Sequence, residues 1–431
     1  MPEARWPNID PAQVTMVRFE DMAQMQNATV PTTTQATFFD SGLTQTYWTG
    51  GFAFFSPGYA WGSYTCGVSA SRVGSVDITC QNINGAQAPT FVALGSGTDA
   101  WTPQGGNYFY LFGVPQALDA PGEWFFDPTS NTLSLWTADS SNPANHLIET
   151  KARLYAFDLT QRSYITISGL SIVSASVHGP FTSNIILSEL DISYGAHTMQ
   201  VPSYSHGEFF TASVSFYPGN YNHVLDSTIT YSAGAAILSS GVANLVQNNV
   251  ISQVSYVALQ TGIRMLLPNI TWVDIGSNRS TVIQNTVFSG GVVLIQIGDG
   301  LNIKYNDAYY SHYQRADLAV MYGFNGQGHD AEIDHNWAHD CFGALNSTLK
   351  YNGCTGVYLD NSCNNYKVYR NVAWNGNPQA WNYQTMGQMA PYEVTKNNVW
   401  AYNTGPGYMS MSTSQAMTNN LGENNIIQYK A

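Results

Sequence analysis

The chain has 431 residues, of which only 10% are charged and 44% are hydrophobic, and its formal net charge is −13. Its 15 Lys and Arg residues form no run, which argues against a nucleic-acid partner. No stretch approaches about 18 consecutive apolar residues, so a transmembrane helix is excluded and no membrane partner is expected.

Residues 1–155 predict an all-β subdomain. Short β-type runs are separated by turns rich in Gly, Pro, Asp and Ser, for example Gly51–Phe55, Ser75–Cys80 and Asn107–Phe112. The scarcity of charge, with Tyr, Asn, Ser, Thr and Gly in its place, favours β-structure and argues against disorder. We expect this subdomain to be a small sandwich or barrel.

Residues 156–431 show a different organisation. Alternating apolar and polar residues occupy Ser163–Leu170, Asn184–Ile192 and Asp226–Thr230, with Gly or Asn where the runs end. No segment has a convincing period of about 3.6 residues, so we expect very little helix. The chain is predicted to be all-β.

An asparagine repeat gives these strands their arrangement. An apolar residue is followed three places later by asparagine at Asn248, Asn285, Asn306, Asn336, Asn371 and Asn397, with gaps of 37, 21, 30, 35 and 26 residues. A minimum near one 21-residue turn, with variable excess, predicts a coil that tolerates insertions at its corners. Asparagine suits a corner because it accepts left-handed geometry and its amide can bind backbone groups. We therefore predict a right-handed parallel β-helix with an internal ladder of stacked amides.

Composition, more than any single signal, favours a secreted protein. Cys66 and Cys80 lie 14 residues apart and could close a hairpin, whereas Cys341, Cys354 and Cys363 allow at most one pair. Asn-x-Ser/Thr sequons begin at residues 27, 269, 278 and 346. Because no CxxC spacing occurs, a zinc site is not expected; no cofactor is predicted, with calcium as the alternative.

Several motifs resemble bacterial right-handed β-helix carbohydrate-active proteins, and the set is similar to glycoside hydrolase family 141 and its unclassified relatives. They are Arg5–Asn8, Leu118–Pro128, Tyr155–Leu159, Asp317–Tyr322, Ile333–Asp340 and Gly356–Asn361. In such proteins the first motif follows several β-helix rungs, and the β-subdomain is inserted after them. Those rungs are absent here, so the resemblance implies a partner chain or a processed N-terminal fragment that caps the first rung.

Three carboxylates are the candidate catalytic residues. Asp317, Asp340 and Asp360 lie in a cluster of acids, and the strands beside Asp317 and Asp360 are expected on adjacent rungs, about 4.8 Å apart. Glycoside hydrolysis needs one carboxyl to protonate the leaving oxygen and one carboxylate to attack or to activate water. The resemblance points to the same two motifs. A structural role in a turn is the alternative for each Asp.

The residues expected to bind substrate surround these acids. They are His339, Tyr322, Tyr358, Trp337 and His335, because sugars stack on aromatic faces and bind polar side chains, although about half of such aromatics pack between rungs instead. The spacing of His335 and His339 does not imply a metal pair, since neither is expected on a helix.

The sequence favours a secreted glycoside hydrolase that acts on a polysaccharide. A polysaccharide lyase is the first alternative, but it needs a base and a cation beside a uronate, and the few cations are scattered. A non-enzymatic extracellular fibre or filament protein is the second alternative, because low charge and an open first rung would permit stacking.

Overall fold

The computed structural model describes residues 3–10, 18–60, 62–81, 91, 101–196, 212–254, 259–261, 263–265, 273–275, 279–314, 318–324, 326–341, 354–360, 363–376, 385–389, 395–396, 399–401, 403–406, 408–411, 417–418 and 420–428. The chain forms two compact units. One comprises residues 1–150, 200–208 and 346–350, and the other comprises the remainder from residue 151. No helix in the described ranges is long and apolar enough to span a membrane.

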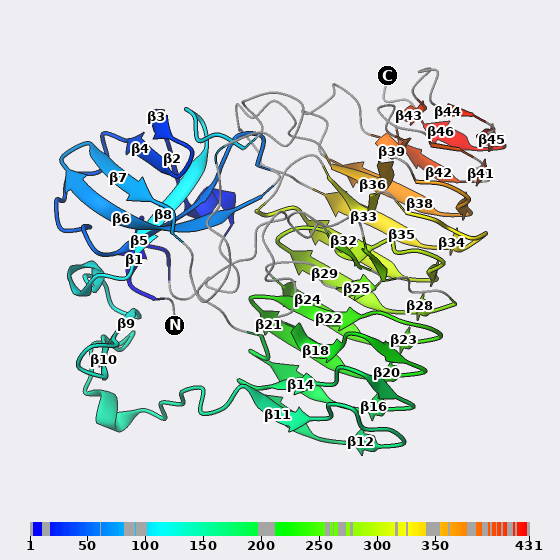
Figure 1. Ribbon diagram of the computed structural model, residues 1–431, viewed down its shortest axis with the longest axis horizontal. Helices are drawn as coiled ribbons and strands as arrows, with labels where there is room; N and C mark the ends of the chain where they lie inside the picture. The colour runs from blue at the N-terminus through cyan, green and yellow to red at the C-terminus, as the bar shows by residue number, and fades with distance from the viewer. Residues whose placement is uncertain are drawn as a thin grey trace. The chain divides into compact units, whose positions relative to one another are not determined.

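The first unit is built on one antiparallel sheet (Figure 1). Its strand order is β1 (Arg5–Trp6), β8 (Tyr108–Phe112), β5 (Phe52–Ser56), β6 (Tyr64–Arg72), β7 (Ser75–Thr79), β4 (Gln35–Phe39) and β3 (Asn27–Thr32), and β2 (Ala23–Gln24) also pairs with β8. A hairpin of β9 (Trp124–Asp127) and β10 (Thr132–Leu135) follows. Short 3₁₀ helices span Phe19–Asp21, Pro115–Ala117 and Pro143–Asn145.

Aromatic packing fills the core of this unit. Phe38 lies edge-on to Phe55 and Phe109, with ring centroids 4.9 and 5.6 Å apart, and all three side chains are fully buried. The predicted Cys66–Cys80 disulfide is present and joins the β6–β7 hairpin. Where a small sandwich or barrel was expected, the described residues of this unit form an antiparallel sheet of eight strands besides the β9–β10 hairpin.

The second unit is a parallel β-helix with three sheets of ten parallel strands (Figure 1). The first sheet contains β11 (Tyr155–Asp158), β14 (Ser176–His178), β18 (Ala212–Phe216), β22 (Ala235–Ser239), β25 (Leu259–Thr261), β30 (Ile295–Gln296), β33 (Leu318–Phe324), β36 (Cys354–Asp360), β39 (Thr385–Met389) and β43 (Tyr408–Met411). The second contains β12 (Thr166–Ser168), β16 (Ile186–Ser188), β20 (His223–Leu225), β23 (Leu245–Gln247), β28 (Thr281–Ile283), β31 (Asn302–Lys304), β34 (Glu332–Asp334), β37 (Lys367–Tyr369), β41 (Val399–Ala401) and β45 (Leu421–Glu423). The third contains β13 (Ser171–Val173), β17 (Asp191–Ser193), β21 (Thr228–Ser232), β24 (Val250–Val254), β29 (Thr286–Gly290), β32 (Asp307–Ser311), β35 (Trp337–Cys341), β38 (Val372–Gly376), β42 (Thr404–Pro406) and β46 (Ile426–Gln428).

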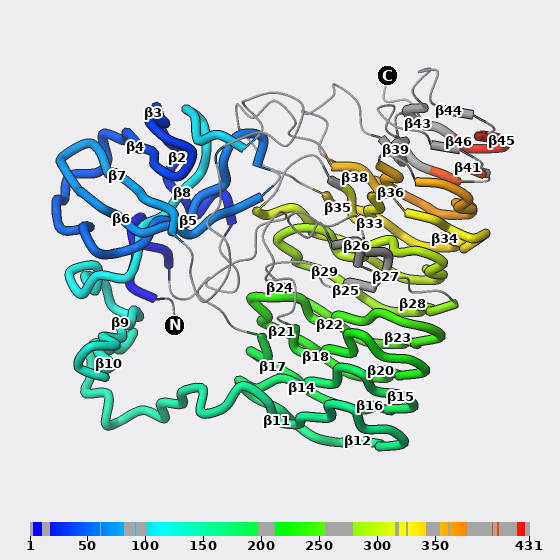
Figure 2. The backbone as a smooth tube through the Cα atoms, viewed as in Figure 1, coloured from blue at the N-terminus to red at the C-terminus, as the bar shows by residue number. Residues whose placement is uncertain are grey.

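The chain visits the three sheets in turn, which Figure 2 lets the eye follow rung by rung. Small two-stranded pairs lie at some corners: β15 (Thr182–Ser183) with β19 (Gly219–Asn220), β26 (Ile263–Met265) with β27 (Val273–Ile275), and β40 (Thr395–Lys396) with β44 (Met417–Thr418). The predicted fold class and the near absence of helix in the described ranges are confirmed.

Period-two alternation places the core inside the coil. In the first eight strands of the second sheet one aliphatic residue aligns with that of the next strand and is buried, in the column Ile167, Leu187, Val224, Val246, Val282, Ile303, Ile333 and Val368. Each strand is too short to bury its apolar face alone, so stability comes from stacking of neighbouring rungs.

The amide ladder is present at the corner between the second and third sheets. Asn249, Asn285, Asn306, Asn336, Asn371, Asn403 and Asn425 follow one another along it. In each step the backbone N–H of one ladder Asn donates to the side-chain oxygen of the next ladder Asn, at 2.9 to 3.0 Å. The stacked amides were therefore predicted correctly.

Two details of the prediction are corrected. The ladder residue is the buried Asn249, while Asn248 is exposed, and Asn403 takes the place expected for Asn397, which lies outside the described residues. Left-handed geometry belongs to the residue before a ladder Asn wherever that residue is described, as for Gln284 with a φ of 58°. The left-handed position is thus not the ladder Asn itself, and it accepts several residue types. The requirement for Asn in the ladder therefore comes from its hydrogen bonds and not from backbone geometry.

Candidate functional site

The predicted neighbours β33 and β36 pair in parallel on adjacent rungs of the first sheet. Phe324 is opposite Asp360 at one end of the pair, and Leu318 is opposite Cys354 at the other. Asp317 lies outside the described residues. Because Leu318 is about 20 Å from Phe324 along the strand, the described strands give no support to a close Asp317–Asp360 pair, which stays a prediction.

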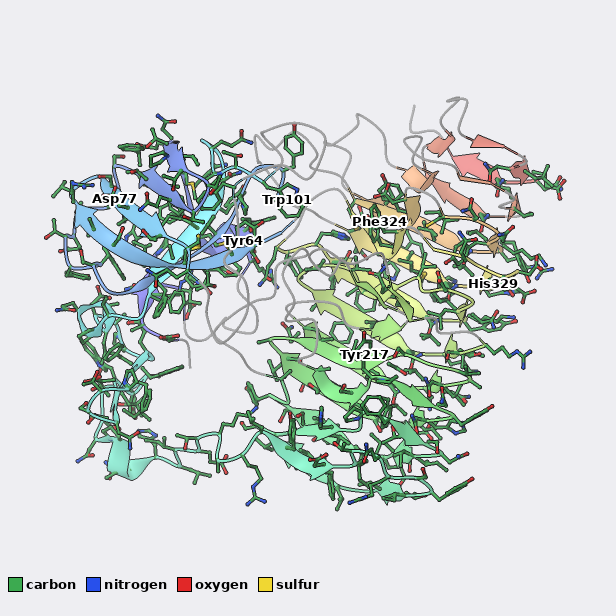
Figure 3. The ribbon with its side chains drawn as sticks, in the orientation of Figure 1. Tyr64, Asp77, Trp101, Tyr217, Phe324 and His329 are labelled. Carbon is green, nitrogen blue, oxygen red and sulfur yellow. A yellow bond between two sulfur atoms is a disulfide. The ribbon has the colours of Figure 1, made fainter. Side chains whose placement is uncertain are left out.

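Asp360 lies beside two tyrosines of the first sheet. The Tyr322 hydroxyl donates to Asp360 Oδ2 at 2.6 Å, and the Tyr322 and Tyr358 rings meet edge to face with centroids 5.4 Å apart. Both tyrosines are buried and pack with the partly buried Phe324, which Figure 3 labels on this sheet. The structure thus brings together Asp360, Tyr322 and Tyr358, three of the predicted site residues.

A second predicted pair, His339 and Asp340, lies on the third sheet. His339 Nδ1 is 2.5 Å from Asp340 Oδ2, and its Nε2 is 2.9 Å from Asp307 Oδ1. The side chains are 13%, 20% and 36% exposed for His339, Asp340 and Asp307, respectively. We call these three residues the Asp–His–Asp cluster.

Both N···O contacts of His339 can be hydrogen bonds at the same time only if the cluster carries one proton more than a neutral imidazole and two carboxylates. A neutral imidazole has one N–H and one lone pair, and an ionised carboxylate can only accept. A neutral His339 between two ionised carboxylates would therefore leave one N···O contact without a proton. One extra proton, on the ring or on either carboxyl group, satisfies both contacts.

Neighbouring rungs fix the position of this cluster. The His339 ring stacks between Tyr309 and Trp374, with centroids 4.9 and 3.9 Å away and planes within 9° of parallel. The Asn375 amide donates to Asp340 Oδ1. Both oxygens of Asp340 thus have partners, whereas Asp307 has one partner among the described residues and is the most exposed of the three.

The remaining residues that were predicted to bind substrate lie in different places. Trp337 lies opposite Asp307 on the next rung and meets Trp374 edge to face at 6.1 Å, so it borders the cluster. His335 stands at the ladder corner, where it contacts Asp334 at 2.8 Å and stacks on Tyr305. The nearby His329 is an exposed turn residue (Figure 3).

Sequence reasoning missed Asp307 and Asn375, yet the ladder carried the signal. Counting three residues on from Asn285, Asn306, Asn336 and Asn371 gives the stacked rings of Phe288, Tyr309, His339 and Trp374. Counting four gives left-handed positions that hold Ser289, Tyr310, Asp340 and Asn375. Since Ser and Tyr also occupy these positions, the turn does not require the carboxylate of Asp340.

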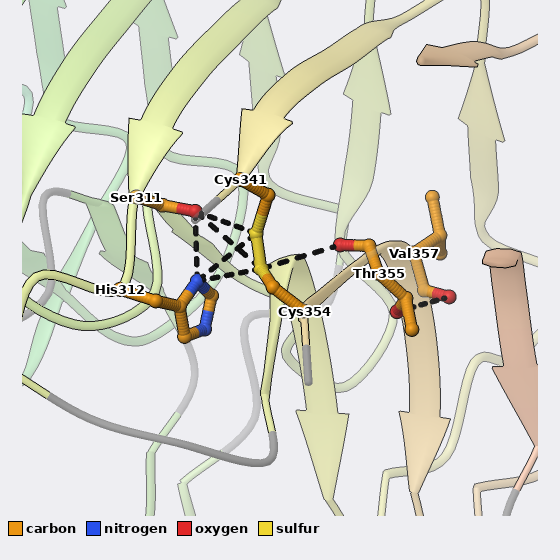
Figure 4. The surroundings of a disulfide bond; sticks show 6 residues. All are labelled: Ser311, His312, Cys341, Cys354, Thr355 and Val357. Atoms are coloured by element: carbon orange, nitrogen blue, oxygen red, sulfur yellow. Dashed lines mark hydrogen bonds between the residues drawn. A yellow bond between two sulfur atoms is a disulfide. The ribbon is translucent and has the colours of Figure 1, made fainter. Parts of the chain in front are cut away.

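A third group of side chains is buried where β32 ends. His312 Nδ1 lies 2.7 Å from Ser311 Oγ and 2.8 Å from Cys354 Sγ, and the cysteine pairs with Cys341 as a disulfide (Figure 4). This resolves the pairing that the sequence left open, and Cys363 keeps its thiol in the buried core of the coil. Complete burial lowers the pKa of His312 to about 3, so its imidazole is neutral. These are also the described residues that could hold a metal ion.

Comparison with known proteins gives only distant likenesses. No protein-family model matches the chain, and no curated protein matches it significantly. Similar solved structures include a protein described as a glycoside hydrolase (10% identity, 94% of this chain and 73% of that chain, TM-score 0.48). Others are PfbA, a surface adhesin of Streptococcus pneumoniae (11%, 65% and 72%, 0.37), and the GH136 lacto-N-biosidase from Eubacterium ramulus (8%, 60% and 51%, 0.35). None of these matches tests the resemblance to family 141, which stays a prediction.

Proposed function

We propose that the protein is a secreted glycoside hydrolase in which the Asp–His–Asp cluster supplies the general acid. The carrying observation is that both ring nitrogens of His339 contact a carboxylate, so that the cluster is satisfied only with one transferable proton. Glycosidic cleavage needs such a proton for the leaving oxygen.

The contacts suggest a separate task for each residue. Asp340 is held at both oxygens and orients His339, whereas the more exposed Asp307 is placed to meet the substrate. The proton passes from the cluster to the glycosidic oxygen as the bond to the sugar carbon breaks. A second carboxylate or an activated water then completes the reaction at that carbon.

Asp317 is the proposed second carboxylate. The connections 312–317 and 342–353 both lead from the third sheet to the first, on neighbouring rungs, and Asp340 lies close to the start of the second of them. Asp317 directly precedes β33 in the sequence, on the side of the strand that the chain enters from the third sheet, whereas Asp360 is the last residue of β36.

The surroundings favour a neutral glycan over a uronate. Trp337 and Trp374 are 53% and 37% exposed and offer apolar faces on which a sugar ring can stack. The cluster has two carboxylates, and none of its contacts within the described residues is with a Lys or Arg side chain. A lyase would need a cation at that place to stabilise the enolate. Two disulfides are in keeping with secretion.

A glycan panel tests this function. Neutral polysaccharides should be cleaved to give new reducing ends, without the ultraviolet absorbance of unsaturated lyase products. Asp307→Asn should lower the rate by roughly 10² to 10⁴-fold, the usual value of a general acid. Asp191→Asn is the matched control, because Asp191 is an exposed carboxylate at the equivalent register of the same sheet, several rungs away. Ultraviolet-absorbing products, or equal rates for wild type and Asp307→Asn, would refute the proposal.

A further inference from the structure

Three segments of the coil deliver one histidine and two cysteines to a single buried point. His312 follows β32, Cys341 ends β35 and Cys354 begins β36, and each of the three side chains is at most 2% exposed. His312 Nδ1 lies 3.2 Å from Cys341 Sγ and 2.8 Å from Cys354 Sγ. The ligand atoms all lie within 4.8 Å of one another (Figure 4).

In the disulfide state the hydrogen-bonding groups of the His312 imidazole are poorly satisfied. Nδ1 has a single proton or lone pair, yet Ser311 Oγ and both sulfurs converge on it. Nε2 is buried and has no hydrogen-bond partner within the described residues. Buried polar atoms without partners are rare and costly, so a histidine here calls for another role.

We propose that His312, Cys341 and Cys354 form a binding site for a thiophilic divalent metal ion, of which Zn²⁺ is the type, when the two cysteines are thiols. A thiol or phosphine reductant supplies two electrons, and two protons are taken up as the S–S bond breaks. The metal ion then displaces the two thiol protons and binds both sulfurs and Nδ1.

The donor set and its charge suit this ion. Two thiolates and one imidazole are the ligands that Zn²⁺ prefers, and the Ser311 hydroxyl faces the same point as a fourth donor. The neutral imidazole and two thiolates balance the two positive charges of the ion, so a buried complex carries no net charge. With Zn–S near 2.3 Å and Zn–N near 2.0 Å, tetrahedral ligands lie about 3.6 Å apart. The imidazole and each sulfur need to separate by less than about 1 Å to reach this.

The sequence did not reveal this site because it lacks a CxxC spacing. The cysteines are 13 residues apart, and His312 precedes Cys341 by 29. Successive turns of the coil bring them together, since Ser311 is opposite Cys341 on adjacent strands. Either state, disulfide or metal complex, ties the end of β35 to the start of β36.

Cobalt and zinc titrations of the full-length protein test the site. After reduction with a phosphine and removal of the reductant under argon, one equivalent of Co²⁺ should give the thiolate charge-transfer and ligand-field bands of a tetrahedral complex, and Zn²⁺ should bleach them. The oxidised protein should bind no cobalt in this form. Because this arm uses one wild-type chain in two redox states, absence of the bands in the reduced, folded protein would overturn the proposal.

Variants locate the ion within the chain. The double variant Cys341→Ser/Cys354→Ser should lose the bands and bind zinc at least about 100-fold more weakly, and His312→Gln should weaken binding roughly 10 to 100-fold. The double variant Cys66→Ser/Cys80→Ser and Cys363→Ser are the controls, because they remove the other disulfide and the remaining thiol; both should bind like wild type. Unchanged binding by Cys341→Ser/Cys354→Ser, with circular dichroism confirming its fold, would place the metal elsewhere and refute the assignment.

Discussion

Each ladder asparagine satisfies several buried backbone and side-chain groups at once. The Asn306 amide donates to the carbonyls of Val282 and Lys304 and to Asn336 Oδ1, each at 3.0 Å. Its oxygen accepts the backbone N–H of Asn285 at 2.9 Å. No apolar residue could replace these bonds, and each orphaned buried group costs about 1–3 kcal/mol.

Asn306→Ala should therefore lower the free energy of unfolding of the coil by roughly 3–5 kcal/mol. Urea denaturation followed by circular dichroism measures this loss. Asn248→Gly is the matched control, because Asn248 is exposed and has a φ of 55°, which glycine accepts readily. Equal denaturation midpoints for Asn306→Ala and Asn248→Gly would contradict a stabilising ladder.

Glu3 introduces a pH dependence into the first unit. Burial raises the pKa of its carboxyl group from 4.5 to about 7. The protonated acid is thus favoured in the folded state, so its stabilising contribution is complete below pH 4.5 and is lost as the pH rises through about 7. Glu3→Gln should remove this loss and make the unit roughly 2 kcal/mol more stable than wild type at pH 8. Parallel stability profiles of the two proteins between pH 4 and pH 8 would show that Glu3 is not responsible.

At the level of the strand and its corner, backbone geometry limits substitution. Gly241 lies between β22 and β23 with a φ of 111°, and a Cβ there would approach the Gly219 carbonyl oxygen to 2.3 Å. Gly169 also has a positive φ, of 68°, but a Cβ on it would meet nothing within 4 Å.

Gly241→Ala should accordingly cost at least about 3 kcal/mol, because the overlap is with backbone of the preceding rung. Gly169→Ala should cost only about 1 kcal/mol, the penalty for a left-handed residue with a side chain. Thermal unfolding of the two variants compares them directly. The account of the corner would be wrong if Gly169→Ala proved the more damaging substitution.

The sequence predicted the strands and the ladder better than it predicted the site. Alternation identified the buried face of each strand, and the Asn repeat identified the corner. The ladder was one residue out at Asn249, because Asn248 and Asn249 are adjacent and the spacing fits either with only a small change. The partnership of Asp307 with His339 escaped notice because the two residues are 32 apart and meet only when β32 and β35 pair.

At the scale of the whole molecule, the variable length of the insertions between strands prevented us from predicting which corner of the coil each acid occupies. Asp317, Asp340 and Asp360 were expected to lie close together, but Asp360 is the last residue of β36 in the first sheet, while Asp340 is the last residue but one of β35 in the third. The long connections between the third and first sheets lie outside the described residues and follow no repeat. From the sequence we could therefore predict which turn of the coil each acid belongs to, but not which corner of that turn it occupies.

The rate of glycan hydrolysis in four single variants tests the central claim most directly. With a cleaved glycan in hand, Asp307→Asn and Asp340→Asn should each lose roughly 10² to 10⁴-fold in kcat, while Asp191→Asn and Asp360→Asn stay within about twofold of wild type, a change too small to reflect loss of a general acid. All four should retain the circular dichroism spectrum of the wild-type coil. Full activity in Asp307→Asn and Asp340→Asn, together with a collapse in Asp360→Asn, would move the catalytic centre from the Asp–His–Asp cluster to the tyrosine-lined end of β36.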